Sequence, residues 1–472
     1  MVSNEIVQKL WNLCNVLRDD GITYHEYVTE LTYILFLKIV DSKNMEEKIG
    51  IPPEFNWKTL SKLDGLDLYN IYRKALLNFS ENQGKLGDIY HGAQTKIEEP
   101  KNLKKIFFEI DKIDWFSIDK ESMGDLYEGL LEKNASEKKS GAGQYFTPRV
   151  LIETIVKIVN PQLGERIYDP AGGTLGFLIS ADRYMRHHND YDSLSDDDYL
   201  WQTKNAMSAM ELVNDTHRLA LMNALLHDID GEIKQGDTLS SNGKELKNFD
   251  VILSNPPFGT KKGGERATRD DILITTSNKQ LNFLQVIYNS LKKTGKARAG
   301  VVLPDNVLFQ DGDGQDVRKD LLNKCNLHTI LRLPTGIFYA QGVKTNVLFF
   351  TRGTEEINNT KEVQIYDLRT NMPNFGKNTP LKSEHFEEFE KSFDKPWEEK
   401  EKIERWSRFT IEEIKAKNYS LDLGLIRDEN QIDHNDLPSP VESAEDAIGK
   451  LEEAVDLLKS VIKELHLCGV EE

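Results

Sequence analysis

Short apolar runs alternate with helical stretches through the middle of this chain, and no other feature of the sequence constrains the fold as strongly. The runs include Arg166–Tyr168, Val251–Leu253, Ala299–Leu303, Thr329–Leu333 and Val347–Phe350. Strands that alternate with helices form βαβ units, whose strands lie mainly parallel in one sheet. We therefore predict an α/β fold with a doubly wound, Rossmann-like sheet. Because such a sheet binds ligands at the carboxyl ends of its strands, the residues that directly follow the apolar runs are the functional candidates.

The chain on either side of this alternating region has a different pattern. The first 135 residues show helical periodicity, and Glu26–Val40 is apolar on most of its circumference, as expected for a buried helix. A helical face precedes it at Ile6, Leu10, Leu13 and Leu17, and Asp125–Glu132 is predicted to be the last helix of this region. We predict a helical N-terminal domain over 1–135, a catalytic domain over 136–383, and an acidic helical C-terminal region over 384–472.

The acidic charge of the chain is concentrated at its C-terminal end. The formal net charge is −18, of which −13 falls after residue 382 and only −5 on the rest. A chain this acidic is not a free-standing nucleic-acid binder with a general basic surface. The tail also repeats apolar residues with 3-4 spacing from Val441 to Leu465. This seam indicates either a helix packed on its own domain or a coiled-coil contact with another chain.

Composition excludes several other classes. The three cysteines are too few for a disulfide scaffold or a structural zinc framework. There is no run of 18 apolar residues and no basic-then-apolar start, so we predict a cytoplasmic protein without a membrane span. His187 and His188 lack a ligand partner at useful spacing, and no metal site is expected.

The strongest motif is Asn255-Pro256-Pro257-Phe258, which directly follows an apolar strand. Two consecutive prolines stiffen the turn. The Asn255 side chain and the Pro256 carbonyl can then present two fixed acceptors, which suit a planar NH₂ group. Phe258 supplies a flat face on which a base can stack. The alternative is an ordinary strand-ending turn, because Asn-Pro is common in turns.

A second strand ends at Asp169 and is followed by a glycine-rich turn, Gly172-Gly173-Thr174-Leu175-Gly176. Glycines in this position allow positive φ and let the backbone approach a ligand. Such a turn alone could bind a dinucleotide. Because the acid precedes the glycines and no Walker lysine follows them, the turn suits a cofactor with a cationic amino-acid end better than a phosphate.

Two more carboxylates, Glu211 and Asp237, fall at predicted strand ends. In a doubly wound sheet, an acid after the second strand typically binds ribose hydroxyls. An acid after the third strand could accept from an exocyclic adenine amine. Each alone is more often a surface carboxylate.

An aromatic pair, Tyr145 and Phe146, precedes Thr147-Pro148 ahead of the first strand. This pattern predicts a helix start, with Thr147 as the cap and Pro148 in the first turn. Such a role is compatible with lining a cofactor pocket.

Taken in their order along the chain, from Phe146-Thr147-Pro148 to Asn255-Pro256-Pro257-Phe258, the motifs resemble the gamma-type amino-methyltransferases that use S-adenosylmethionine. Longer segments are similar to the methylation (M) subunit of type I restriction–modification systems, and the resemblance extends over roughly residues 1–350. The segments that carry it are residues 26–41, 124–149, 219–230, 301–309 and 333–350.

The resemblance implies a DNA adenine-N6 methyltransferase that flips its target base. It implies that Asn255, Pro256, Pro257 and Phe258 form the adenine site. It also implies a complex of two such chains with one specificity (S) subunit, which a restriction (R) subunit can join. The residues predicted to contact the cofactor are Tyr145, Phe146, Thr147, Pro148, Asp169, Gly173, Thr174, Glu211 and Asp237.

One position departs from the family pattern. The family usually has glycine where this chain has Leu175. If the position requires positive φ, leucine is strained by about 1–3 kcal/mol, and cofactor binding by the isolated chain is expected to be weak. The side chain is tolerated if it points into the interface between sheet and helix.

Two other functions remain open. The chain could be a methyltransferase acting on RNA or on a protein amide, because the Asn-Pro-Pro-aromatic motif serves any planar NH₂. It could also be a non-catalytic assembly subunit disabled at Leu175.

Contacts to DNA phosphates are predicted from Lys138, Lys139, Lys261, Lys262, Arg266 and Arg269, with a mobile polar loop as the alternative reading of the last four.

Overall fold

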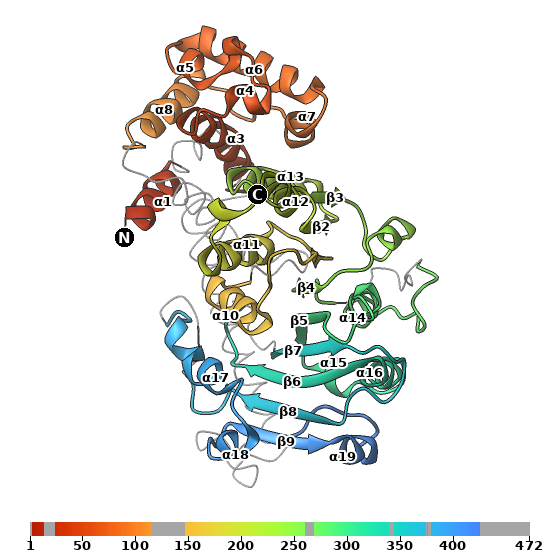
Figure 1. Ribbon diagram of the computed structural model, residues 1–472. Coiled ribbons are helices and arrows are strands. Elements are labelled where there is room, and N and C mark those ends of the chain that lie inside the picture. Colours follow the sequence, from red (N-terminus) through yellow and green to blue (C-terminus); the bar gives the residue numbers. More distant parts are fainter. Residues whose placement is uncertain are drawn as a thin grey trace, which may run out of the picture. The chain divides into compact units, whose positions relative to one another are not determined.

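A computed structural model of the chain describes residues 2–13, 24–115, 147–259, 269–338, 344–373, 375 and 379–424 (Figure 1). Contacts group Met1–Leu425 into one compact unit and Ile426–Glu472 into another. The predicted heptad seam of the tail lies outside the described residues, as do Leu17 and the helix predicted over Asp125–Glu132.

The N-terminal part of the first unit is helical, and its described residues contain no strand. The prediction for Glu26–Val40 is confirmed, because α3 buries nearly every side chain from Leu31 to Val40. None of the helices in the described part of the chain is long and apolar enough to cross a membrane. The helices of this part are α1 (Val2–Asn12), α3 (Tyr24–Ser42), α4 (Glu46–Ile49), η1 (Pro53–Phe55), α5 (Trp57–Leu60), α6 (Gly65–Glu81), α7 (Lys85–Tyr90) and α8 (Pro100–Asp111).

The rest of the unit is built on a nine-stranded sheet with the order β3-β2-β1-β4-β5-β7-β6-β8-β9 (Figure 1). Neighbouring strands are parallel from β3 through β5, whereas β7 and β9 run antiparallel to their neighbours. Four of the five apolar runs named above lie within strands, and the fifth overlaps β1 from Ile167. The predicted α/β sheet is therefore confirmed, although its second half is mixed rather than parallel. The strands are β1 (Ile167–Asp169), β2 (Met207–Glu211), β3 (Glu232–Gln235), β4 (Val251–Ser254), β5 (Arg298–Pro304), β6 (Cys325–Leu333), β7 (Thr345–Arg352), β8 (Glu362–Asp367) and β9 (Trp406–Thr410).

Helices cover both faces of this sheet. In β4, Val251 and Leu253 pack in one core with α10 and α11, whereas Ile252 packs in another core with α14 and α16. This division follows from the strand period of two, which sends alternate side chains to opposite faces. The helices of this part are α10 (Arg149–Val159), α11 (Gly176–His188), η2 (Tyr191–Ser193), α12 (Asp196–Lys204), α13 (Asn214–Leu226), η3 (Ser241–Glu245), α14 (Lys279–Ser290), α15 (Asn306–Phe309), α16 (Asp313–Lys324), η5 (Ser383–Phe386), α17 (Glu387–Ser392), α18 (Trp397–Lys400) and α19 (Ile411–Ala416).

The sheet continues past the predicted domain boundary at residue 383. Strand β9 pairs with β8, with Trp406 opposite Tyr366, and both side chains are buried in the core under α17. Residues 384–424 therefore belong to the sheet domain and are not part of a separate helical tail. This strand was not predicted from the sequence, because an edge strand tolerates charged residues and β9 exposes Arg408 on its outer side.

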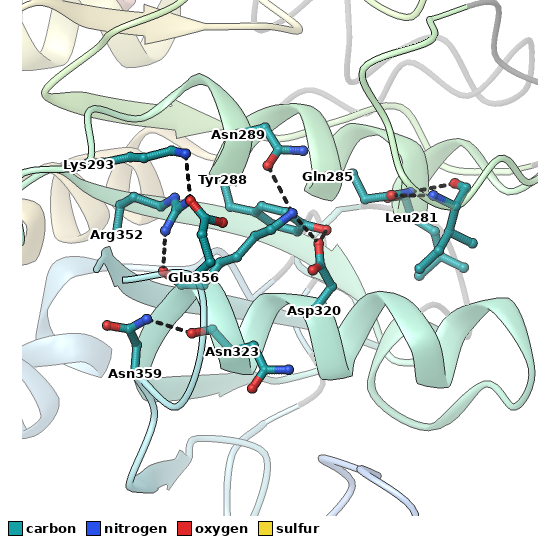
Figure 2. Close-up of polar contacts among 12 residues, drawn as sticks. Leu281, Gln285, Tyr288, Asn289, Lys293, Asp320, Asn323, Arg352, Glu356 and Asn359 are labelled. Atoms are coloured by element: carbon teal, nitrogen blue, oxygen red, sulfur yellow. Dashed lines mark hydrogen bonds and ion pairs between the residues drawn. The ribbon is translucent and has the colours of Figure 1, made fainter. Parts of the chain in front are cut away.

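A polar network joins α14 to its neighbours (Figure 2). The Tyr288 hydroxyl of α14 donates to Asp320 of α16 at 2.6 Å, and the Lys324 ammonium donates to the same carboxylate at 2.8 Å. Beyond β7, Glu356 accepts from Lys293 at 2.6 Å and from Arg352 at 2.7 Å. These contacts attach the C-terminal end of α14, and the segment that follows it, to the surrounding fold.

Candidate active site at the ends of β1, β2 and β4

The order in which the chain adds strands to the sheet reverses between β1 and β4. From β1 the chain continues to β2 and β3 on one side, and from β4 it continues to β5 on the other side. Ligands bind at such a switch point. Asp169 ends β1, and Ser254 ends β4 on the adjacent strand. The Ser254 hydroxyl donates to Asp169 Oδ1 at 2.7 Å, which joins the two turns. The sequence analysis missed Ser254, although a polar residue at the end of an apolar strand was a usable signal.

Asp169 is a buried carboxyl whose hydrogen bonds from the protein both end on one oxygen. Its Oδ1 accepts from Ser254 and, at 3.0 Å, from the backbone N–H of Ala171. Burial, with a smaller contribution from the neighbouring Glu211 carboxylate, raises the pKa of Asp169 to about 7, although these two hydrogen bonds lower it. The carboxyl can therefore change protonation near neutral pH, and neither of these two hydrogen bonds from the described residues involves Oδ2.

The glycine-rich turn after β1 is held by its backbone. Gly173 has a φ of +53°, and its N–H donates to Glu211 Oε2 at 2.9 Å. A Cβ added to Gly172 would meet Ala209 Cβ at 3.0 Å, so the turn passes too close to β2 for a larger residue. The Thr174 carbonyl accepts from the side-chain amide of Asn223 at 2.8 Å.

Leu175 has a positive φ, and its side chain also points into the interface between the sheet and the helices. Its φ is 70°, in the left-handed region, and it occupies the N-cap position of α11. Its side chain is fully buried in the core between the sheet and α10 and α11. A leucine in this conformation is disfavoured by about 1–2 kcal/mol, and the burial of its side chain opposes that cost.

Glu211 and Asp237 lie at the next two strand ends, as predicted. Glu211 ends β2, is buried, and accepts from the N–H of Gly173 through Oε2 and of Val213 through Oε1 at 2.8 Å. Burial raises the pKa of Glu211. Asp237 follows β3, is half-buried, and accepts from the N–H of Leu239 at 2.8 Å.

The turn after β4 has a buried acceptor, Asn255 Oδ1, without a partner among the described residues. The Asn255 amide donates through Nδ2 to the Thr147 hydroxyl at 2.8 Å. Its Oδ1 is buried and accepts no hydrogen bond from any described residue. Further along the turn, the Pro257 carbonyl accepts from Gln280 of α14 at 3.4 Å.

Phe258 is half-buried at the end of this turn. Its ring meets the edge of the Phe338 ring, with centroids 6.2 Å apart and planes at 74°. Edge-to-face pairs of this kind fix the orientation of both rings. The sequence analysis did not single out Phe338, which lies in the loop after β6, because nothing local shows that this loop returns to β4.

Thr147 is not the cap of the following helix, so that prediction is wrong. Helix α10 begins at Arg149, and Pro148 occupies the N-cap position without a side-chain cap. Thr147 is buried one residue earlier, and its hydroxyl accepts from Asn255 instead. The tertiary partner therefore takes the oxygen that a local cap would have used. Tyr145 and Phe146 lie outside the described residues.

The prediction that Arg269 contacts phosphate is also wrong. Its side chain is buried and donates through Nε and Nη2 to Asp271, each at 2.8 Å. Nη1 donates to the carbonyls of Thr238 at 3.0 Å and Gly243 at 3.1 Å, so the guanidinium serves the fold. The other basic residues named for phosphate contacts, Lys138, Lys139, Lys261, Lys262 and Arg266, lie outside the described residues.

Metal ligands do not gather at this site. Among the described residues, no three His, Cys, Asp or Glu side chains lie close enough together to hold a metal ion. His188 stacks on Tyr184 with ring centroids 4.1 Å apart, at the end of α11.

Known proteins resemble this chain over its whole length. The sequence model of the N-6 DNA methylase family matches residues 118–435, and that of the HsdM N-terminal domain matches residues 6–113. The EcoKI methylase subunit of Escherichia coli K12, named as a type I restriction enzyme subunit, is 44% identical, covering 98% of this chain and 96% of its own length. The StySJI methylase subunit of Salmonella typhimurium is 43% identical with the same coverage.

Solved structures agree with this similarity. The crystal structure of the EcoKI M protein has a TM-score of 0.57 at 40% identity and covers 98% of this chain and 96% of that one. A chain from a study of assembly and conformational transition in the type I R-M system has a TM-score of 0.74 at 28% identity, covering 98% of both chains. A class I S-adenosylmethionine-dependent methyltransferase from Listeria monocytogenes, at 17% identity and a TM-score of 0.52, shares the fold alone.

Proposed function

This chain belongs to the methylase subunits of type I restriction enzymes, which are DNA adenine-N6 methyltransferases, and from this premise we propose how it works. We infer that it transfers a methyl group from S-adenosylmethionine to the exocyclic amine of an adenine flipped out of the duplex. The observation that carries this proposal is the Asn255 Oδ1 atom, which is buried at the end of β4 and has no partner among the described residues.

Asn255 is proposed to accept a hydrogen bond from the target amine. The Thr147 hydroxyl already accepts from Nδ2, so the amide offers its oxygen and not its nitrogen to the substrate. The amine of adenine is a poor nucleophile because its lone pair is delocalised into the ring. Hydrogen bonds from its two protons to Asn255 Oδ1 and the Pro256 carbonyl localise that lone pair on nitrogen. Acceptors fixed before the reaction lower the barrier most effectively.

Phe258 is proposed to stack on the flipped base. Flipping costs the stacking and pairing of the adenine in the duplex, and an aromatic face recovers part of that cost. The edge-to-face contact with Phe338 helps to fix the orientation of the Phe258 ring. The stiff Pro256-Pro257 turn holds the ring relative to Asn255.

The cofactor is proposed to bind the turn after β1, and the groups there fit it. Asp169 Oδ2 would accept from the cationic amino-acid end, and the Glu211 carboxylate has lone pairs left for ribose hydroxyls. A Cβ at Gly173 would meet only the Ala171 carbonyl at 3.9 Å, so the backbone is open to a ligand there. When bound, the cofactor supplies an electrophilic methyl group on a sulfonium. Tyr145, Phe146, Thr147, Pro148, Thr174 and Asp237 complete the proposed binding set.

The chain is proposed to act in a cytoplasmic complex. Its curated relatives are subunits of type I restriction enzymes, so we propose two copies with one specificity subunit, which a restriction subunit can join. The net charge of −18 agrees with a subunit that obtains most of its DNA affinity from a partner. The target sequence would then be read by the specificity subunit.

The test is reconstitution with labelled cofactor. The chain would be purified alone and with the specificity subunit encoded beside it, and each would be offered duplex DNA, RNA and protein. We expect N6-methyladenine in DNA from the complex and little product from the chain alone, measured by mass spectrometry of digested product. Methyl transfer to RNA or to a protein amide would favour the second function considered above. If the complete complex with DNA binds no cofactor, the chain is an assembly subunit and the proposal fails.

A further inference from the structure

Helix α13 lies between two cores and is the starting point for a further inference. Leu221, Met222 and Leu226 belong to the core of the N-terminal helices. Ala220 and Ala224 belong to the core of the sheet domain, so the two sides of the helix serve different parts of the unit. Side chains three or four residues apart share a side of a helix, which explains this division.

The N-terminal helices also hold α13 through polar contacts. The Arg218 guanidinium donates to the carbonyl of His91 at 2.7 Å and to the hydroxyl of Tyr33. The Lys43 ammonium donates to the carbonyl of Leu226 at the end of the helix. Both ends of α13 are thus tied to the helical region as well as packed against it.

Asn223 lies on α13 and faces the cofactor turn. It is 1% exposed, and its Nδ2 donates to the Thr174 carbonyl at 2.8 Å. Its Oδ1 is also buried and accepts no hydrogen bond from a described residue. A buried acceptor without a partner destabilises a protein, so this amide is a poor choice if its only task is to fill the core.

The Thr174 carbonyl lies between two residues of the turn that have positive φ angles. Thr174 is flanked by Gly173 and Leu175, which have φ angles of +53° and 70°. Leucine is strongly disfavoured in this region, so the turn would lower its energy by changing its backbone angles if it were released. Such a change would move the Gly173 N–H away from Glu211, its present acceptor.

We propose that Asn223 is a positioning residue for the cofactor. It holds the Thr174 carbonyl and thereby keeps the turn in the conformation in which Gly173 and Glu211 face the ligand. Because α13 is packed on the N-terminal helices, the same bond makes the turn sensitive to how those helices hold α13. This inference rests on the proposed cofactor site.

The test compares Asn223→Leu with Met222→Ala in the complex with the specificity subunit. Leucine has a similar size but neither donates to Thr174 nor leaves an unpaired oxygen. We expect its melting temperature to be equal to or above that of the wild type. We expect the affinity for S-adenosylmethionine, by calorimetry, to fall about two- to tenfold, the worth of one hydrogen bond. In the cofactor-free protein, backbone amides of residues 170–178 should exchange faster with deuterium.

Met222→Ala is the matched control, since it truncates the neighbouring side chain in the other core. We expect it to lower the melting temperature and, because the hydrogen bond from Asn223 to Thr174 is retained, to reduce cofactor affinity less than Asn223→Leu does. The proposal is overturned if Asn223→Leu keeps both wild-type affinity and wild-type exchange of the turn. If that variant does not fold, Asn223→Ala is put through the same measurements. A wild-type complex that binds no cofactor refutes the proposed function, while the exchange rates still decide the role of Asn223.

Discussion

The turns after β1 and β4 follow adjacent strands, but they differ in how completely their polar atoms are hydrogen-bonded within the protein. In the β1 turn, Asp169 through Oδ1, Glu211 through both carboxylate oxygens and the Thr174 carbonyl accept hydrogen bonds from within the chain. In the β4 turn, the Asn255 amide is bonded only through its nitrogen, and its buried oxygen has no partner among the described residues. The first turn is thus held by hydrogen bonds within the chain, whereas the second has a buried acceptor that we propose the substrate amine to occupy.

The largest expected effect comes from breaking the β4 turn with Asn255→Ala. It removes the acceptor proposed to bind the target amine, so kcat for DNA methylation should fall about 100- to 1,000-fold. The affinity for S-adenosylmethionine should fall far less than kcat, because the Asn255 side chain touches the proposed cofactor residues through one hydrogen bond, to Thr147. Single-turnover methylation and calorimetric titration measure the two quantities.

Asn255→Asp is the matched variant for this experiment. It keeps an oxygen acceptor but cannot donate to Thr147, so its activity should lie between those of the wild type and the alanine variant. Full activity of Asn255→Ala would show that the amine does not depend on this acceptor, and the distinction between the turns would lose its catalytic meaning.

A smaller effect is expected from changing the β1 turn with Leu175→Gly. Glycine relieves about 1–2 kcal/mol of left-handed strain but removes a buried leucine, which is worth about 2–5 kcal/mol. The free energy of unfolding should therefore fall by about 1–3 kcal/mol, measured by urea denaturation. Leu178→Gly in α11, a buried leucine with no positive φ to relieve, should cost more. A gain in stability for Leu175→Gly would mean that strain dominates the turn.

A pH dependence of stability is also expected from Asp169 in the β1 turn. Burial raises the pKa of Asp169 to about 7 from 3.8, so the folded protein binds more protons than the unfolded chain between these values. The stability of the cofactor-free protein should therefore rise as pH falls from about 7 to about 4. Cofactor affinity should change in the opposite sense, because protonation removes the negative charge that the cationic end needs. The loss is at most about tenfold per pH unit.

Asp169→Asn separates this effect from other titrations. Thermal melting from about pH 4 to about pH 8 should show a flatter stability profile for this variant than for the wild type, while Glu211, whose pKa burial also raises, remains in both proteins. Identical profiles would mean that Asp169 does not titrate in this range.

The periodic parts of the fold and the strand-end positions could be predicted because their signals are local. Alternation of apolar runs located the strands, and the buried circumference of Glu26–Val40 located α3. The predictions that failed concern residues whose role depends on a hydrogen-bonding or strand partner far away in the sequence. Thr147 was taken for a cap and Arg269 for a phosphate ligand, yet both bond to groups of the folded chain. Strand β9 was missed because its pairing with β8 matters more than its own composition.

Local sequence therefore determined which residues stand at the ends of β1, β2 and β4, and the family resemblance already implied the chemistry of methyl transfer. Tertiary structure alone decided which polar atoms are paired. Ser254 meets Asp169 across 85 residues, Asn255 meets Thr147 across 108, and Asn223 meets Thr174 across 49. A hydrogen bond depends on distances of a few tenths of an ångström, and such distances between remote residues exist only once the strands and helices have packed.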